Sequence, residues 1–265
     1  MSFLDALLFQ PFINILIFLY KLFGQNLGWA IIGLTLLLRT ALLPLTTSNL
    51  KMSQEMKKLQ PELEALKKKY GKDKQAFAQA QIKLYQKHGV NPAGGCLPLI
   101  VQLVILGFLY KAFRQVLQAD GNVIQQLNNI LYPFLKLPKE TVFNTRFFYL
   151  DLAKPDLIAL PFKLNLGPLK LEKIPGIFLI TAAASQFFSS KLMMPIVKQE
   201  EKISKKTPEK EDDMAVAMQK QMVYMMPLFT LFIGFSFASG LVLYWLTFSV
   251  FMLVQQLYFK RRKTP

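Results

Sequence analysis

The sequence predicts an all-α polytopic membrane protein, with five transmembrane helices around a hydrophilic groove and a helical hairpin in the cytoplasm. Hydrophobic residues make up 52% of the chain and the mean hydropathy is +0.30, which is unusual for a soluble domain. The net charge of +16 gathers between long apolar runs, as the positive-inside rule expects of a membrane protein. Polar side chains within those runs indicate the groove.

The composition excludes several other classes. A strongly basic chain suggests nucleic-acid binding, but zinc-ligand spacings are missing and the apolar runs are too long for a soluble nucleic-acid module. Cys96 is the only cysteine, so the chain has no internal disulfide. It follows small residues as in a lipid-attachment motif but lies far from the N-terminus, and we interpret it as a packing residue. His88 is the only histidine, which excludes a multi-histidine metal site, and we expect neither metal nor cofactor.

Residues 1–25 form an N-terminal segment that is apolar but unsuited to cross a bilayer. Four polar residues and a central proline interrupt residues 3–23, namely Asp5, Gln10, Asn14, Lys21 and Pro11. An amphipathic helix lying in the membrane interface fits this pattern. An uncleaved signal-like segment is the alternative, and the sequence leaves open whether the segment is removed.

Residues 26–50 contain the first firm span, 28–48, and Arg39 is its single charge. Arg39 lies roughly 16 Å along the helix from Gly28, well inside a hydrocarbon core about 30 Å thick. A charge near the centre of a span costs about 2.5–3.5 kcal/mol, so it usually faces water or a partner and has a function. The alternative is an arginine that extends its head to the cytoplasmic headgroups.

Residues 51–91 predict the cytoplasmic helical hairpin, because ten lysines and four acids replace the apolar run. Pro61, followed by acidic residues, is typical of a helix start. Residues 71–73 form the turn between the helices. The first helix has a heptad-like apolar seam of Met52, Met56, Leu59, Leu63, Leu66 and Tyr70, and the second a weaker stripe of Phe77, Gln81, Leu84 and His88.

The remaining chain completes the topology. Residues 119–174 have seven basic and five acidic side chains, so this loop is far less basic than the hairpin and is expected outside. This places the N-terminus outside and the C-terminus in the cytoplasm. The other segments are a second span in 92–118, a third in 175–195, a cytoplasmic loop in 196–221, a fourth span in 222–238, a fifth in 239–259 and a basic tail in 260–265.

Polar residues three or four apart share one face of a membrane helix and form stripes on three predicted spans. The stripes are Thr35, Arg39 and Thr46 on the first span, Ala182, Gln186, Ser189 and Ser190 on the third, and Tyr244 and Thr247 beside Trp245, with Gln255 further along, on the fifth. Hydrogen bonds between helices explain each stripe taken singly. Because none of the five spans contains Asp or Glu, a water-filled cavity that solvates Arg39 is the simplest interpretation of all three.

The residues argue against an ion pathway and an enzyme, and leave two other functions to be weighed. A proton or ion pathway normally needs acidic relays, and no hydrolase or phosphate-binding motif occurs, so we expect a protein that is not an enzyme. A small-solute channel or transporter could use the same cavity, although inverted repeats and broken helices at the midplane are missing. A membrane anchor that binds RNA through its lysines would leave Arg39 unexplained.

The order of several short motifs resembles one known family. The motifs are Gly28-Trp29, Leu38-Arg39, Pro44-Leu45, Asn91-Pro92, Cys96-Leu97-Pro98 with Gln102, Met226-Pro227, Gly240 followed by Tyr244-Trp245, and Gln255-Gln256. Over about residues 10–260 the chain resembles the YidC/Oxa1/Alb3 family of membrane protein insertases, and among them a short bacterial YidC. The chain departs from the family pattern at two places: Ala238-Ser239 stands where the family often has Pro-Ala, and Ser249 stands where it often has Asn.

The resemblance implies an insertase and membrane chaperone that places nascent membrane proteins in the bacterial inner membrane without nucleotide hydrolysis. It implies a groove that includes Arg39, Gln186 and Trp245, and the stripes add Thr35, Ser189, Ser190 and Tyr244. Motif or packing roles fall to Cys96, Pro98, Gln102 and Gly240, and ribosome contact to the tail residues Lys260, Arg261, Arg262 and Lys263. Implied partners are nascent membrane proteins, the ribosome, the lipid bilayer, the Sec translocon and the signal-recognition-particle machinery.

A physical mechanism is consistent with this resemblance. A water-filled groove shortens the stretch of lipid that the polar segment next to a client's apolar helix, its flank, must cross. Arg39 could bind an acidic flank during this step. Partitioning of the apolar segment into lipid then supplies the driving force, at about 0.3–0.6 kcal/mol for each Leu, Ile, Val or Phe. We therefore expect the carboxylate that pairs with Arg39 to belong to the client.

Overall fold

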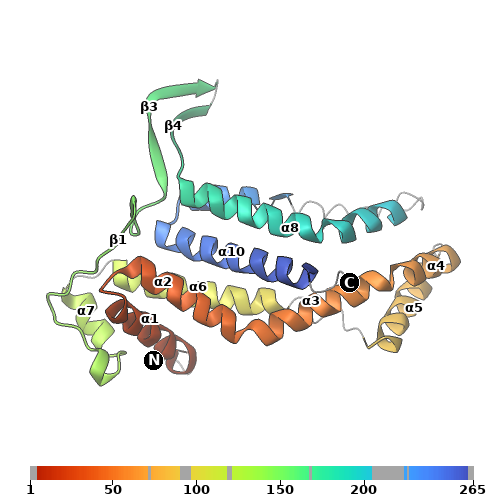
Figure 1. The fold of residues 1–265 in the computed structure, drawn as a ribbon, viewed down its shortest axis with the longest axis horizontal. Coiled ribbons are helices and arrows are strands. Elements are labelled where there is room, and N and C mark those ends of the chain that lie inside the picture. The colour runs from red at the N-terminus through yellow and green to blue at the C-terminus, as the bar shows by residue number, and fades with distance from the viewer. Residues whose placement is uncertain are drawn as a thin grey trace. The chain divides into compact units, whose positions relative to one another are not determined.

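The computed structural model describes residues 5–70, 73–89, 97–117, 121–166, 169–204, 224–225 and 227–261. It is mostly helical (Figure 1) and divides into two compact units. Cys96, Arg262, Lys263 and residues 205–221 of the predicted cytoplasmic loop lie outside the described residues.

The larger unit comprises Met1–Arg39, Ile105–Leu192 and Tyr224–Pro265. Helices α6 and α8 each run across a boundary between the two units. The helical elements with residues in this unit are η1 (Asp5–Phe9), α1 (Gln10–Leu22), α2 (Leu27–Ala41), α6 (Leu97–Leu117), α7 (Gly121–Asn128), η3 (Pro133–Leu135), α8 (Ile177–Ser204), the helical residues 227–234 and α10 (Ser239–Arg261).

Helix α1 contributes to the core of the larger unit and uses its polar residues internally. Ile13, Leu16 and Ile17 are fully buried. Asn14 is also buried, and its Nδ2 donates to the carbonyl of Ile130 at 3.1 Å while its Oδ1 accepts from the N–H of Tyr132 at 2.7 Å. The polar residues that made this segment a poor span in the sequence therefore fasten it to the chain after α7.

The predicted first span is divided at Leu42, where α2 ends and α3 (Leu43–Lys58) begins. Pro44 accounts for the break, because proline removes a helical N–H and disfavours helix at the residue before it, yet fits the first turn of a new helix. Among the described residues, one single helix, Ser239–Phe259, is long and apolar enough to cross a membrane. The two helices on either side of Leu42 pass the same criteria when they are taken together as one bent span. The count of five spans stays a prediction.

The predicted loop 119–174 contains ordered elements, namely α7, η3 and two antiparallel hairpins. Strands β1 (Arg146–Phe147) and β2 (Leu150–Asp151) pair through a two-residue turn. Strands β3 (Leu157–Leu166) and β4 (Leu169–Pro175) form a longer hairpin with an irregularity between Ala159 and Leu164, where Pro161 cannot donate a ladder hydrogen bond. This hairpin extends away from the helices, and β4 is followed directly by α8 (Figure 1).

The core of the larger unit joins these elements to the helices. Apolar side chains from α1, α2, α6, α7, α10 and the loop between α7 and β3 form one continuous cluster. Its large fully buried members include Ile31, Leu34, Leu109, Ile124 and Leu152. This packing positions α2 and α10, which carry most of the candidate site.

The smaller unit comprises Thr40–Val104 and Met193–Val223, and its complete helices are α3, α4 (Gln60–Tyr70) and α5 (Lys74–Lys87). Asp73 caps α5 by accepting from two backbone N–H groups. His88 Nε2 lies 3.4 Å from Glu62 Oε2, which joins the end of α5 to the start of α4, so the two helices run in opposite directions. Leu59 and Tyr85 form a small buried cluster between them.

Candidate functional site

Arg39 lies in the last turn of α2, and its side chain is only 7% exposed. Its guanidinium carbon lies 3.5 Å from the ring centre of Phe248 on α10. Its Nη1 also lies 4.0 Å from the sulfur of Met252, one turn further along α10. A cation over an aromatic ring is stabilised by about 0.5–2 kcal/mol, so these contacts hold the arginine in a mainly apolar setting.

Of the groove residues predicted on α10, Tyr244 lies near Arg39. Tyr244 is almost fully buried and within electrostatic reach of Arg39, and its ring centre lies 6.2 Å from that of Phe248. Trp245 is half-buried and packs against the apolar core. Phe248 and Met252 were missed in the sequence because apolar side chains on a span give no signal, although their spacing of four and eight residues from Tyr244 places them on its face.

The predicted threonines turn their hydroxyls to their own helices. Thr35 donates to the carbonyl of Ile31 at 2.7 Å, and Thr247 donates to that of Leu243 at 2.8 Å. Thr46 makes the same kind of bond within α3, in the smaller unit. Such a bond uses the hydroxyl's hydrogen within its own helix, so these threonines have little capacity left to donate to a group in a groove.

Gln186 on α8 makes its contact with a residue that the sequence analysis missed. Its Oε1 accepts from the hydroxyl of Thr230 at 2.6 Å. Four residues beyond Thr230 is Gly234, where any side chain would overlap Leu179 of α8. A threonine one turn before a glycine is the signal that could have identified this close approach, because small residues let membrane helices pack tightly.

The serines of α8 contribute a second polar group. Ser189 is 9% exposed, and its hydroxyl has no hydrogen-bond partner within the described part of the chain. Ser185, one turn earlier, is also buried, and Ser190 is half-buried. A buried hydroxyl without a hydrogen bond costs about 1–3 kcal/mol, which makes Ser189 an unusual feature of the helix interior.

The predicted motif residues fall in different places. Pro98 is the second residue of α6, where proline suits a helix start, and Gln102 is half-buried in the same helix within the smaller unit. Gly240 begins α10, and a Cβ there would lie 3.4 Å from both the carbonyl of Leu152 and the ring of Phe113. Of the tail, Lys260 and Arg261 belong to the last turn of α10.

Residues 144–156, here called the capping segment, satisfy the N-terminal backbone of three helices. The carbonyl of Asn144 accepts from Leu27 at the start of α2, at 3.2 Å. At the start of α10, Ser239 N–H donates to the carbonyl of Lys154 at 2.7 Å, and Gly240 N–H donates to that of Leu152 at 3.1 Å. The first N–H groups of a helix have no partner within it, so one segment supplies acceptors to several helix ends.

At α8 the acceptor is a buried carboxylate. Asp156 is 1% exposed, and its Oδ2 accepts from the N–H of Leu179 at 2.8 Å. Its Oδ1 accepts from the hydroxyl of Tyr149 at 2.9 Å, and that hydroxyl in turn accepts from the N–H of Phe178 at 3.1 Å. Gly176 is required beside it, because any side chain there would overlap the carboxylate. A negative charge at a helix N-terminus is also favoured by the helix dipole.

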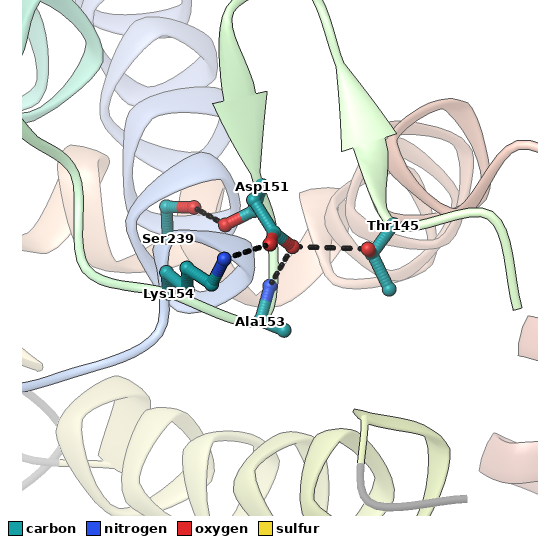
Figure 2. Close-up of polar contacts among 5 residues, drawn as sticks. All are labelled: Thr145, Asp151, Ala153, Lys154 and Ser239. Atoms are coloured by element: carbon teal, nitrogen blue, oxygen red, sulfur yellow. Dashed lines mark hydrogen bonds and ion pairs between the residues drawn. The ribbon is translucent and has the colours of Figure 1, made fainter.

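Asp151 organises the part of the capping segment that meets α10 (Figure 2). Its Oδ1 accepts from Thr145 Oγ1 at 3.0 Å and from Ala153 N–H at 3.2 Å, and its Oδ2 lies 3.2 Å from Lys154 Nζ. Its carbonyl accepts from the hydroxyl of Ser239, a fully buried residue, at 2.9 Å. The bond to Asp151 therefore adds to the two backbone hydrogen bonds that join this loop to α10.

The pKa values in the capping segment follow from these bonds. Burial alone would raise the pKa of Asp151, but hydrogen bonds from Ala153 and Thr145 and the ion pair with Lys154 outweigh it and hold the pKa below its usual value. Burial raises the pKa of the Tyr149 hydroxyl, and the neighbouring Asp156 carboxylate adds to this effect. Asp151 is thus favoured as an anion, and Tyr149 as the neutral donor that its bond to Asp156 requires.

The larger unit thus has a buried cation and a buried hydroxyl without a described partner in its helix interiors, and helix starts whose N–H groups donate to the capping segment. Within the described part of the chain, no group of three or more His, Cys, Asp or Glu could hold a metal ion. An apolar pocket of about 510 Å³ lies between α8 and residues 224–231, lined by side chains such as Ala183, Phe187 and Leu228. The arrangement suits transient binding of polar groups next to apolar surface.

Comparison with known proteins gives consistent matches along the chain. The family model described as 60Kd inner membrane protein matches residues 18–265. A membrane protein insertase YidC from Fusobacterium nucleatum is 35% identical over 239 residues, which are 90% of this chain and 87% of that protein. Proteins of the same name from Pelobacter propionicus and Geobacter sulfurreducens are 31% and 30% identical, over 95% and 97% of this chain but only 38% of their own lengths.

A solved structure is also similar. It is described as an active YidC insertase crystal structure with the first transmembrane domain resolved, and it is similar with a TM-score of 0.53 and 25% sequence identity. The similarity covers 97% of this chain and 47% of that one. The chain thus spans most of the Fusobacterium relative and less than half of the longer proteins.

Proposed function

Because the chain belongs to the 60Kd inner membrane protein family of YidC membrane protein insertases, we propose that it inserts nascent membrane proteins into the bacterial inner membrane through a hydrophilic groove. Arg39, Gln186, Ser189, Tyr244 and Trp245 line this groove. Insertion needs no nucleotide, and the protein works alone or beside the Sec translocon. The basic tail, from Lys260 onward, contacts the ribosome, and the signal-recognition-particle machinery delivers some clients.

The observation that carries this proposal is the buried guanidinium of Arg39 in an apolar helix assembly. This guanidinium contacts the ring of Phe248 and the sulfur of Met252, and none of the five predicted spans contains Asp or Glu. An acidic group on a client flank can therefore still gain from approaching it, and that gain is large where water is scarce. Ser189 adds a buried hydroxyl that a client backbone can bond.

The driving force is the transfer of the client's apolar segment into lipid. The apolar pocket between α8 and residues 224–231 lies along the same helix as Gln186, so a polar flank and an apolar segment can be held on neighbouring surfaces of α8. Each Leu, Ile, Val or Phe that enters lipid contributes about 0.3–0.6 kcal/mol. Several such residues offset the cost of carrying a short polar flank across.

The capping segment supports a groove that is closed at one end. It supplies acceptors to the starts of α2, α8 and α10, so these three helices begin on one side, as the first, third and fifth spans of the predicted topology require. Helix N–H groups that are bonded to the capping segment are not free to bind water at that side. We therefore place the opening of the groove at the opposite, cytoplasmic side.

The test is insertion of two matched clients, one with an acidic and one with a neutral flank, into vesicles that contain only this protein and lipid. We expect Arg39→Ala to reduce insertion of the acidic-flank client roughly tenfold, which corresponds to about 1.4 kcal/mol. Arg39→Lys keeps the charge and should retain most of the activity. Insertion of both clients should proceed without nucleotide.

Equal insertion of the acidic-flank client by wild type and Arg39→Ala would show that the charge of Arg39 has no role in insertion. Failure of wild-type protein to insert either client would refute the proposed activity itself. Protease protection of the transferred flank measures both outcomes, and circular dichroism of each variant shows whether it is folded.

A further inference from the structure

The turn between β1 and β2 has an unexpected residue at its strained position. Phe148 and Tyr149 make the two-residue connection, and Phe148 has a φ of +52°. Hairpin turns of this length favour Asn, Asp or Gly, because other side chains are disfavoured at positive φ. Gln25 is the only other residue besides glycine with positive φ in the described chain, so a bulky aromatic here needs a reason.

Burial does not provide that reason, because Phe148 is 78% exposed. The ring instead joins a continuous group of rings around the buried Phe147, which lies against Gly28. We call the exposed and half-buried members of this group, with the adjoining Ile177, the turn surface. Its residues are Trp29, Phe148, Tyr149, Ile177 and Phe178, with ring centres of neighbouring aromatic pairs 4.8–6.3 Å apart through Phe147.

The position and charge of the turn surface point to one occupant. It lies where α2 and α8 begin, next to the exposed Arg146 and Lys154 of the capping segment. Aromatic residues at the ends of membrane helices favour the boundary between lipid and water, and basic residues there favour anionic headgroups. We propose that the turn surface is seated in the headgroup region of the bilayer and that Phe148 is its insertion anchor.

A protein partner fits this surface less well. Stable protein interfaces involve about 20–30 residues on each partner, whereas the turn surface consists of five. A bilayer needs no such number, because a few aromatic rings and one or two basic groups suffice to hold a loop at an interface. The proposal rests only on the membrane location of the family and is independent of insertase activity.

The experiment uses a nitrobenzoxadiazole label on a single cysteine, on a Cys96→Ala background, in vesicles of phosphatidylcholine and phosphatidylglycerol. Labels at Phe148→Cys, where the aromatic label itself takes the place of the phenylalanine ring, and at Ile177→Cys should emit at shorter wavelength and lose emission to lipids that carry a nitroxide near the headgroup. The control is Lys139→Cys, an exposed position in a polar turn, whose label should respond to an aqueous quencher instead. The vesicles contain no client, so the result does not depend on insertion.

A second variant tests Phe148 without disrupting the turn. Asparagine tolerates positive φ, so Phe148→Asn should keep the hairpin and lose the ring. We expect the label at Ile177→Cys to lose much of its lipid quenching in this variant. The proposal is wrong if the labels at 148 and 177 behave like the label at 139, and Phe148 is not the anchor if Phe148→Asn leaves the quenching at 177 unchanged.

Discussion

The capping segment and the surroundings of Arg39 differ in how their buried polar groups are hydrogen-bonded. At the helix ends, the carboxylate of Asp156 accepts two hydrogen bonds and the hydroxyl of Ser239 donates to a backbone carbonyl. In the helix interiors, the guanidinium of Arg39 rests on a ring and a sulfur, and the hydroxyl of Ser189 has no partner among the described residues. Both regions belong to the same unit and the same helices.

This difference separates what stabilises the protein from what is available to a client. A bonded polar group contributes to stability, whereas a buried hydroxyl such as that of Ser189, with no hydrogen bond among the described residues, costs free energy and can gain from a ligand. Substitutions in the capping segment should therefore lower stability, and substitutions near Ser189 should change binding while leaving stability the same or higher. The following predictions test this contrast.

The largest effect is expected for Gly176→Ala. Its methyl group would overlap the Asp156 carboxylate and displace it from the N–H of Leu179, leaving a buried charge with fewer hydrogen bonds. We expect a loss of about 2–4 kcal/mol in the free energy of unfolding, from the lost bonds and the cost of overpacking. Thermal unfolding in detergent measures this.

Gly107→Ala is the matched control for this substitution. Gly107 lies within α6, and a Cβ there would meet no atom within 4 Å. Alanine is favoured over glycine in a helix by about 1 kcal/mol, so this variant should be as stable as wild type or more so. Equal losses for both variants would show that α8 does not depend on the cap.

Two buried serines give the most direct comparison. Ser239→Ala removes the bond to the carbonyl of Asp151 and should cost about 1 kcal/mol, the usual net value of an intramolecular hydrogen bond. Ser189→Ala removes a buried hydroxyl without a described partner, so stability should stay the same or rise by up to about 1 kcal/mol. Chemical unfolding in mild detergent separates the two, and a clear loss for Ser189→Ala would reveal a hydrogen bond at that position.

A smaller effect is expected from the titration of Asp151. Its folded pKa lies below its usual value of 3.8, so the folded state binds fewer protons than the unfolded state near that pH. The resulting stabilisation is complete above the usual pKa and is lost as the pH falls through the lower, folded pKa. The difference in melting temperature between wild type and Asp151→Asn should therefore shrink on acidification below about pH 4. A difference that is constant from pH 3 to 6 would contradict this.

Much of the candidate site could be predicted from the sequence because charge and polarity within an apolar run are visible without a structure. Arg39 and Tyr244 are buried near each other, as expected. Gln186 is hydrogen-bonded to Thr230 of another helix, as polar residues between membrane helices often are. Phe248 and Met252 could not be found in this way, because a ring or thioether that supports a cation looks like any lipid-facing residue. Thr230 was missed because a single hydroxyl on a span stands out only when it is considered together with Gly234, four residues further on.

The loop between the second and third predicted spans shows a different limit. Its near-neutral charge identified it as a connection, but its helix, its two hairpins and its role as a cap were not evident. Asp151, Asp156 and Tyr149 act on residues between 23 and 88 positions away, and such contacts leave no local periodicity. The break at Leu42 was also not expected, although Pro44 is its visible cause.

The sequence by itself determined the class of the protein, its membrane character, its family motifs and the position of its one charge in the first apolar run. Composition and spacing suffice for these, because contact with lipid limits the polarity of each side chain without regard to the residues it meets. Only the tertiary structure decided that one segment caps three helices and that Arg39 rests on Phe248 and Met252. Those features depend on which distant backbone groups and side chains meet, and pairwise contacts of that kind form only when the chain is folded.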